Sequence, residues 1–440
     1  MNDAAAGGSE RAGREDRAAE QDPARGTDDS AGRDSQASGS TGGKGDPDTR
    51  AGGDSSGDSG SSTDRGAMSS SGSSGDAGGA ALAPTLDQTS NPAYGQVDTY
   101  KSWLSTETTN DAKLSVDRQL ADNIITWQLP HGGFYKNGVD KYRKRWDGSE
   151  PRADWKGDNG IELGTIDNQA TVTELMFLAD VYQRSHADSY RVAVRKTFEF
   201  LLTMQYPSGG FPQVYPARSG ASYSNYVTFN DDAMARVLIM LQQAVREAPP
   251  LHAELFTSEQ RGRAKDAIAR AVDFILAAQI VQAGVKTVWC AQHDPKTHEP
   301  RGARSYELPS KSGSESVGVI GFLMTEPQTD AVKAAVQAAL AWYVNPAVKR
   351  ENTAYVKRPQ GSNDDSYNPI QTHLGSTMWC RFYELESDDC FFSGRTSADS
   401  PPGKGKQRDI MAIEPERRYG YQWGGSYGAK LLDYAQRVGY

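Results

Sequence analysis

The sequence predicts an all-α domain built from helical hairpins arranged round an axis. Three observations support this fold class. Apolar residues recur at helical spacing in a series of segments, a short glutamine-glycine motif recurs along the chain, and long connections alternate with short ones. We expect residues 91–440 to form this one domain, because their length is enough for a single large core.

Residues 1–90 have a different composition from the rest of the chain. They are dominated by Gly, Ser, Asp, Ala and Arg and contain no Val, Ile, Leu, Phe, Tyr or Trp before Leu82. Such a segment cannot bury apolar surface to offset the entropy lost on ordering, so we expect a disordered tail whose deletion leaves turnover and stability nearly unchanged. The tail holds 16 acidic and 8 basic residues and therefore accounts for −8 of the net charge of −9. The near-neutral domain gives no reason to expect a nucleic-acid partner, and no apolar run is long enough for a membrane span.

Apolar stripes define the expected helices in chain order. The clearest example is 257–279, where the stripe follows a capping box formed by Thr257 and Gln260. The others show the same three- and four-residue spacing of apolar side chains. The predicted helices span 111–128, 165–186, 190–205, 231–247, 257–279, 315–324, 329–343 and 426–437.

An internal repeat accompanies these helices. WQLPHGGF (127–134) and MQYPSGGF (204–211) share a glutamine and a Gly-Gly-Phe, and a third helix ends in AAQ (277–279) without the glycines. The glutamines are 77 and 74 residues apart. This spacing suits one long helical hairpin with its loops, repeated three times.

The connections between helices alternate in length. In hairpins arranged round an axis, alternate connections lie at the same end, so we expect the long loops to share one face and to carry the functional site. The long loops span 129–164, 206–229 and 280–314, and the short ones 187–189, 248–256 and 325–328.

Two acidic motifs open helices directly after long loops. They are TIDNQAT (165–171) and TFNDDAM (228–234). Asp167 or Asn230 could simply be a helix N-cap. However, two such motifs on one face offer more oxygen atoms than caps need, and clustered carboxylate and amide oxygens are what Ca²⁺ requires.

Arginines accompany aromatic residues in the later part of the chain. The loop 289–316 places Arg304 close to Tyr306, and Arg381 and Arg395 lie in WCRFYELE and FFSGR. A solvated charged loop is the plain alternative. Guanidinium groups bind carboxylates bidentately and aromatic faces stack on sugar rings, so the set indicates a polyanionic sugar as ligand.

Cysteines and histidines give no metal pattern. Reduced, buried thiols are the favoured interpretation of Cys290, Cys380 and Cys390, ahead of a Cys380–Cys390 bridge. His293 and His298 lack zinc-type spacing, and we expect them at the surface or at the edge of a substrate site. The sequence contains no G-x-S-x-G motif, Walker loop or Rossmann fingerprint.

Taken together, the motifs resemble polysaccharide lyase family 10, the pectate lyases. The resemblance implies a partial (α/α) toroid, cleavage of polygalacturonate by β-elimination to 4,5-unsaturated oligogalacturonates, dependence on Ca²⁺, and a secreted or extracytoplasmic monomer. The matching segments cover about 120–425 in order: QLPHGGFYK, TIDNQAT, QYPSGGFPQVYP, TFNDDAM, WCAQHDPKT, RSYELPSKSGSES, RFYEL, FFSGR and ERRYGYQW.

The resemblance also implies roles for individual residues. Asp167, Asn168 and Asp231 would face the calcium ion that bridges protein and substrate, and Asp231 would also contact the substrate. The arginine roles are implied in the same way: Arg304 and Arg381 would hold substrate carboxylates, and Arg395 would abstract the proton.

Three other functions fit parts of the pattern. A toroid hydrolase could use two carboxylates from Asp167, Asp231, Asp232 and Glu307. A terpenoid-cyclase-like toroid shares the glutamine-glycine motif but would need a D-x-D-D motif, which is absent. A non-catalytic pectin-binding module would not need the acidic set and Arg395 together.

Overall fold

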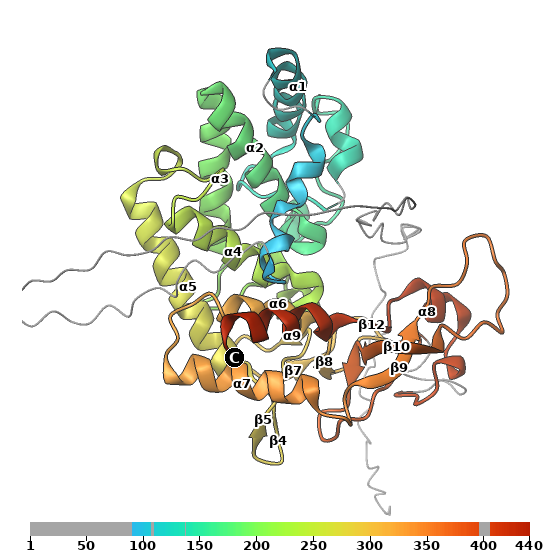
Figure 1. Cartoon of the computed structure of the whole chain (residues 1–440). Helices are drawn as coiled ribbons and strands as arrows, with labels where there is room; N and C mark the ends of the chain where they lie inside the picture. Colours follow the sequence, from blue (N-terminus) through green and yellow to red (C-terminus); the bar gives the residue numbers. More distant parts are fainter. Residues whose placement is uncertain (1–89, 107–109, 137, 396–404) are drawn as a thin grey trace, which may run out of the picture. The chain divides into compact units, whose positions relative to one another are not determined.

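The computed structural model describes residues 90–106, 110–136, 138–395 and 405–440 (Figure 1). All of them belong to one compact unit, which spans 76–440. Apart from Ser90, the predicted tail lies outside the described residues. Within the described ranges, no helix is both long enough and apolar enough to cross a bilayer.

All eight predicted helices are present. The largest difference is at α2, which begins at Val172 instead of 165 because Asp167–Gln169 form a separate 3₁₀ turn. The capping box of Thr257 is confirmed, and the short helix α8 was not predicted. The helices are α1 Asp111–Trp127, α2 Val172–Ser185, α3 Asp188–Met204, α4 Ala233–Val245, α5 Ser258–Ala278, α6 Glu315–Leu323, α7 Asp330–Val344, α8 Pro415–Gly420 and α9 Tyr427–Val438.

The first seven helices form two layers (Figure 1). Helices α2, α4 and α6 pack in a row, and α1, α3, α5 and α7 pack in a second row outside it. Nearly every residue of α4 is buried, whereas α3 and α5 bury one stripe and expose the other. Each buried Leu, Met or Phe contributes about 1.5–3 kcal/mol, so the inner row supplies much of the stability. This arrangement agrees with the predicted partial (α/α) toroid.

The repeated glutamine has the same structural role three times. Helices α1, α3 and α5 each end at it, and its side-chain amide donates both to a carbonyl of the following loop and to a carbonyl inside the next outer helix. The latter bonds run from Gln128 to Ala193 (2.9 Å), from Gln205 to Ala267 (2.8 Å) and from Gln279 to Ala335 (2.9 Å).

The glycines of the first two repeats are needed for close contact. A Cβ on Gly132 would lie 2.3 Å from a carbonyl oxygen of α3, and one on Gly209 would lie 2.0 Å from a carbonyl oxygen of α5. Both glycines also have a positive φ, 102° and 100°. The third repeat dispenses with these glycines and keeps only the glutamine.

Replacing Gln279 by alanine is expected to lower the free energy of unfolding by about 2 kcal/mol. The side chain is almost fully buried, and its loss removes the hydrogen bonds that it donates to the carbonyls of Thr287 and Ala335. Denaturant titration measures the change. Gln436→Ala, at an exposed position of α9, is the control and should change stability by less than about 0.5 kcal/mol. Equal stability of the two variants would contradict this role.

The three long loops lie at one end of the helices, as predicted. Short antiparallel ladders join the first loop to the second, the second to the third, and the third to the segment after α7. A separate hairpin closes the start of the third loop. The strands involved are β1 Gly164–Thr165, β2 Val214–Tyr215, β3 Val227–Thr228, β4 Val281–Gln282, β5 Val285–Lys286, β6 Gln292–His293, β7 Pro300–Arg301, β8 Lys311–Ser312 and β11 Phe382–Tyr383.

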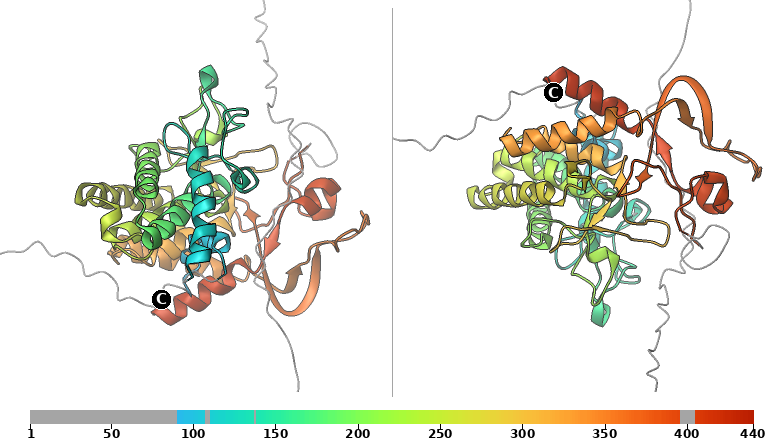
Figure 2. Two further views of the ribbon diagram at one scale, coloured as in Figure 1. Left: turned by 90° about the horizontal axis from the view of Figure 1, so that it is seen from above. Right: turned by 90° about the horizontal axis from the view of Figure 1, so that it is seen from below.

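The all-α prediction is incomplete, because the segment after α7 forms a sheet. Strands β9 (Arg350–Tyr355), β10 (Ile370–Cys380) and β12 (Gly424–Gly425) pair antiparallel in the order β12-β10-β9. Figures 1 and 2 show this hairpin to the side of the helices. The segment has no helical apolar spacing, and its two longer strands carry β-branched and aromatic residues such as Thr353, Tyr355, Ile370 and Trp379, which favour strands.

The prediction of reduced thiols was wrong for two of the three cysteines. Cys380 and Cys390 form a disulfide with a Cα–Cα distance of 5.9 Å, while Cys290 is free and buried. The chain turns back between them, where Tyr383 bridges to Cys390 and the Glu384 N–H donates to the Asp389 carbonyl. This turn brings together two residues that are ten positions apart.

The segment before α1 packs across the inner helices. The Asn91 amide donates to the Gly321 carbonyl in α6, the Tyr94 hydroxyl donates to Gln242 in α4, and the 3₁₀ helix Asp98–Trp103 packs on α2. Tyr94 and Tyr100 are buried. The first described residues are therefore part of the core.

Candidate functional site

Two matching turns precede the inner helices α2 and α4. They are the 3₁₀ turns Asp167–Gln169 and Asn230–Asp232, and they lie in contact. Asn168 and Asp231 both have left-handed backbones, with φ of 47° and 51°. The N-cap residues of α2 and α4 are Thr171 and Asp232, so the capping interpretation fails for Asp167 and Asn230.

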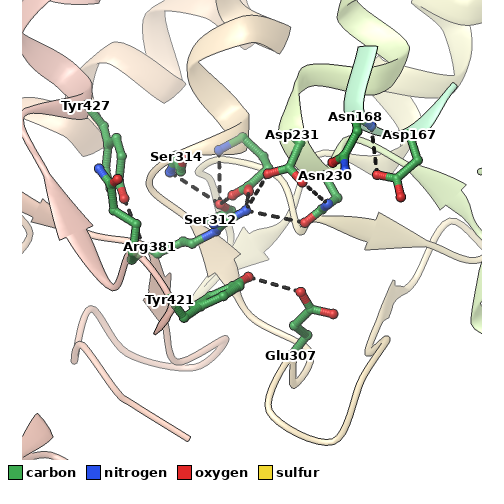
Figure 3. Close-up of polar contacts among 12 residues, drawn as sticks. Asp167, Asn168, Asn230, Asp231, Glu307, Ser312, Ser314, Arg381, Tyr421 and Tyr427 are labelled. Carbon is green, nitrogen blue, oxygen red and sulfur yellow. Dashed lines mark hydrogen bonds and ion pairs between the residues drawn. The ribbon is translucent and has the colours of Figure 1, made fainter. Parts of the chain in front are cut away.

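Asp167 is a buried carboxylate with few partners. Its Oδ1 accepts a hydrogen bond from the Asn168 N–H (3.0 Å), and its Oδ2 lies 3.3 Å from Lys136 Nζ. Burial raises the pKa of Asp167, Lys136 opposes the shift and Asp231 adds to it. The two carboxylates of the acidic motifs are thus within electrostatic reach of each other. We call Asp167 and Asp231 the acid pair (Figure 3).

Arg381 links the acid pair to the third inner helix. Its Nη2 donates to Asp231 Oδ1 (3.0 Å) and to Asn230 Oδ1 (3.3 Å), and it also pairs with Glu315 (Figure 3). Glu315 accepts a further hydrogen bond from the Ser312 hydroxyl. Burial would lower the pKa of Arg381, but Glu315, together with Tyr421 and Asp231, outweighs burial and keeps the pKa well above its ordinary value.

Sequence reasoning missed Glu315, although a signal was available. It is the first residue of α6 and follows the third long loop. The acidic motifs before α2 and α4 occupy the corresponding positions. Glu315 could have been predicted by looking for an acidic residue at the start of each inner helix.

Arg304 is fixed by a buried acid. Its Nε and Nη2 bind Glu307 in a fork, at 2.9 and 2.6 Å, and the Tyr421 hydroxyl donates to the same carboxylate (3.0 Å; Figure 3). Burial would lower the pKa of Arg304, but Glu307 outweighs it and raises that pKa. Tyr421 joins Arg304 to Arg381: its hydroxyl binds the Glu307 carboxylate that holds Arg304, and its ring centre lies 4.5 Å from the Arg381 guanidinium carbon.

Three arginines surround the ring of buried Tyr306. The guanidinium carbons of Arg304, Arg395 and Arg417 lie 4.9, 5.2 and 4.8 Å from the ring centre. Glu416 binds both Arg395 and Arg417. We call this group the Tyr306 arginine cluster. Arg417 was not predicted, because an arginine in ERRYGYQW carries no signal of its own.

The structure therefore brings together five of the six predicted site residues. Asp167, Asn168, Asp231, Arg304 and Arg381 surround one region at the loop end. Arg395 adjoins this region through the Tyr306 ring, which it shares with Arg304, but 46% of its side chain is exposed and its guanidinium is bound to Glu416 (3.2 Å).

The histidine prediction was wrong for His293. The ring is fully buried, accepts from the Cys290 N–H (2.9 Å) and contacts the His298 carbonyl (2.8 Å). Burial lowers its pKa to about 4, so it is a neutral core residue that holds the third loop together.

The site offers oxygen ligands for a hard cation. Asp167, Asn168 and Asp231 contribute side-chain oxygens from two contacting turns, and each carboxylate of the acid pair has a cation beside it, Lys136 at Asp167 and Arg381 at Asp231. In the described part of the chain, no group of three or more His, Cys, Asp or Glu side chains could hold a metal ion. A cation here would share its ligands with the substrate or water.

Comparison with known proteins decides the family. Residues 128–432 match the family of pectic acid lyases. The family 10 polysaccharide lyase from Cellvibrio cellulosa is 40% identical, covers 81% of this chain and 99% of its own, and superposes with a TM-score of 0.67. The chain belongs to the family 10 polysaccharide lyases. Its activity is that of a pectate lyase, as predicted.

Other comparisons add to this assignment. An aspartate-to-alanine mutant of the Cellvibrio lyase, solved in complex with trigalacturonic acid, has the same identity, coverage and TM-score. A type II terpene cyclase from Scytonema is 16% identical with a TM-score of 0.21, which is too low to carry an argument. Among curated proteins, no relative matches this lyase.

The hydrolase alternative also lacks support from the geometry. Asp232 lies against α6, where a Cβ on Gly318 would be 2.3 Å from its Oδ1, and burial raises its pKa to about 7. Glu307 is held by Arg304 and Tyr421. Neither carboxylate is placed as a free partner for Asp167 or Asp231.

Proposed function

We propose that this lyase cleaves polygalacturonate by calcium-assisted β-elimination and releases 4,5-unsaturated oligogalacturonates. One observation carries the proposal: an acid pair lies beside the guanidinium groups of Arg304 and Arg381. A neutral sugar has no charge for these guanidinium groups to pair with, whereas every galacturonate unit carries a carboxylate. The Cellvibrio relative solved with trigalacturonic acid supports this substrate class.

Asp167, Asn168 and Asp231 would hold the calcium ion. When bound, calcium would neutralise the uronate carboxylate and so acidify the hydrogen on C5. Arg381, anchored by Glu315, would bind the same carboxylate. Its fixed position means that no reorganisation is needed as charge develops.

Two arginines compete for proton abstraction. The family resemblance assigns proton abstraction to Arg395. The contacts of the two arginines favour Arg304 for this role. Arg304 is held by Glu307 and is linked through Tyr421 to Arg381, which binds Asp231, whereas Arg395 is half-exposed and paired with Glu416. A base must be within hydrogen-bond reach of the proton it removes. We therefore place Arg304 at C5 and keep Arg395 as the alternative.

The elimination then follows from these positions. The C5–H bond breaks and its proton passes to a neutral guanidine, while the C–H electron pair forms the C4–C5 double bond. The C4–O bond breaks, and the oxygen of the departing chain keeps the electron pair of that bond and takes a proton from water. The Glu307 pairing favours the protonated form of Arg304. Arg304 would therefore have to lose a proton before it could act as a base, and the positive charge of a bound calcium ion would favour that loss by lowering its pKa.

We also propose a secreted or extracytoplasmic monomer whose residues 1–90 are dispensable for turnover. Its polymeric substrate cannot enter a cell intact, and the Cys380–Cys390 disulfide is stable in an oxidising compartment. Comparison of the full chain with a variant that lacks residues 1–90, by turnover and gel filtration, tests the last two points.

Chelation is expected to abolish turnover, and added Ca²⁺ to restore it. Asp167→Ala should lower turnover at a fixed Ca²⁺ concentration by about a hundredfold, because it removes one carboxylate of the acid pair. Product formation is followed by the ultraviolet absorbance of the new double bond. Asp140→Ala is the matched control, since this exposed aspartate in the same loop pairs only with Arg143 among the described residues.

Two results would contradict the calcium proposal. The first is full activity in excess chelator. The second is an Asp167→Ala variant that loses activity only because it unfolds, which a melting curve detects. Since Thr171, not Asp167, is the N-cap residue of α2, we expect the variant to remain folded.

A further inference from the structure

A second basic group adjoins the acid pair through Lys136. Arg218 lies in the second long loop and has no ion pair with any described carboxylate. Its Nε is buried and has no hydrogen-bond partner in the described part of the chain. A buried guanidinium nitrogen without a hydrogen-bond partner lowers the stability of the protein unless a ligand accepts its hydrogen bond.

The backbone of Arg218 is held in place. Its N–H donates to Asn225 Oδ1 (2.9 Å), and the Asn225 amide donates back to its carbonyl (2.7 Å). The Asn225 carbonyl in turn accepts from the Tyr206 hydroxyl (2.8 Å). Arg218 is thus presented by a fixed turn.

The indole of Trp155 groups Arg218 with a second cation. Lys136 Nζ lies 4.4 Å and the Arg218 guanidinium carbon 5.8 Å from the ring centre. Lys136 also binds Asp167, so this group is continuous with the acid pair. Two different long loops contribute to it, the first with Lys136 and Trp155 and the second with Arg218.

Tyr223 connects this group to the other side of the site. Burial raises its pKa, and the charges of Arg304, Glu307, Asp167 and Arg218 all act on its hydroxyl. The contacts with Trp155 place Arg218 beside Lys136, which binds Asp167 of the acid pair. Tyr223 is still 39% exposed and can contact a sugar.

We propose that Arg218 binds the carboxylate of a second galacturonate unit, distinct from the unit held at the acid pair. Each unit of the polymer carries a carboxylate, and the acid pair with Arg304 and Arg381 accounts for only one. An unpaired guanidinium with a fixed backbone provides a site for the next. The proposal rests on the proposed substrate and adds a subsite that selects for acidic polymer over single units.

The test compares Arg218→Gln, Arg218→Lys and Arg437→Gln on polygalacturonate. Arg437, on α9, pairs with Asp433 and serves as the matched surface control. We expect Arg218→Gln to raise KM about tenfold with kcat within about twofold of the wild type, and Arg218→Lys to restore part of the loss. The control should match the wild type.

Three results would overturn the proposal: an unchanged KM for Arg218→Gln, a fall in kcat at unchanged KM, or an equal change in the Arg437→Gln control. Melting curves of all variants exclude unfolding as the cause. Failure of the calcium proposal is seen separately, because it appears as chelator-resistant turnover of the wild type, whereas this test depends only on the ratio of KM values.

Discussion

Arg304→Lys is expected to lower kcat about a thousandfold, which corresponds to roughly 4 kcal/mol of transition-state free energy. Lysine keeps the positive charge but loses the fork that binds Glu307 and moves the nitrogen away from the C5 proton. Affinity for trigalacturonate should fall far less than kcat, because a cation remains beside the acid pair. Initial rates by ultraviolet absorbance and calorimetric binding of trigalacturonate measure the two effects.

The companion variant Arg395→Lys separates the two candidate bases. With Arg395 as a carboxylate ligand at the edge of the site, we expect a rise in KM of about tenfold and a smaller change in kcat. The reverse pattern, an inactive Arg395→Lys and an active Arg304→Lys, would return the proton-abstracting role to Arg395. Loss of trigalacturonate binding by Arg304→Lys would instead make Arg304 a substrate ligand.

Glu315→Ala is expected to destabilise the fold by about 3–5 kcal/mol. It removes the buried partner of Arg381, whose side chain is only 10% exposed, and leaves a cation in the core with Asp231 alone. Denaturant titration measures the loss. Glu351→Ala breaks a pair that is 64% exposed at Glu351 and should cost less than about 1 kcal/mol.

A double variant tests whether Glu315 acts through charge. Replacing Glu315 by leucine and Arg381 by methionine removes both charges, so most of the lost stability should return. Turnover should stay low, because Arg381 no longer holds substrate. Recovery of turnover in the double variant would exclude Arg381 from the reaction.

The helices could be predicted because each one buries an apolar stripe, and the positions of the long loops followed from their alternation. The acidic motifs could be found because they are contiguous. The local backbone conformation was harder to predict. The left-handed residues Asn168 and Asp231 make α2 and α4 begin later than predicted, and the spacing of apolar residues does not show such turns.

The parts that escaped prediction depend on distant segments meeting. Arg304, Arg395 and Arg417 come from three regions and are joined only by the ring of Tyr306. The Cys380–Cys390 bridge likewise requires the turn after β11. Spacing in the sequence carries little information about such contacts, since it does not specify which loops pair.

The packing of the first described residues on α6 has a consequence for synthesis on the ribosome. Asn91 bonds to Gly321, which is made 230 residues later. At about 5–20 residues per second, the N-terminal segment waits roughly 12–46 s for this partner. The segment with Tyr94 and Tyr100 can pack on α4 and α2 once those helices have emerged, but the side of α4 that packs on α6 stays uncovered until α6 has been made. The nascent chain therefore exposes apolar surface of its inner helices until α6 has been made. We expect a chaperone to be most useful during this time.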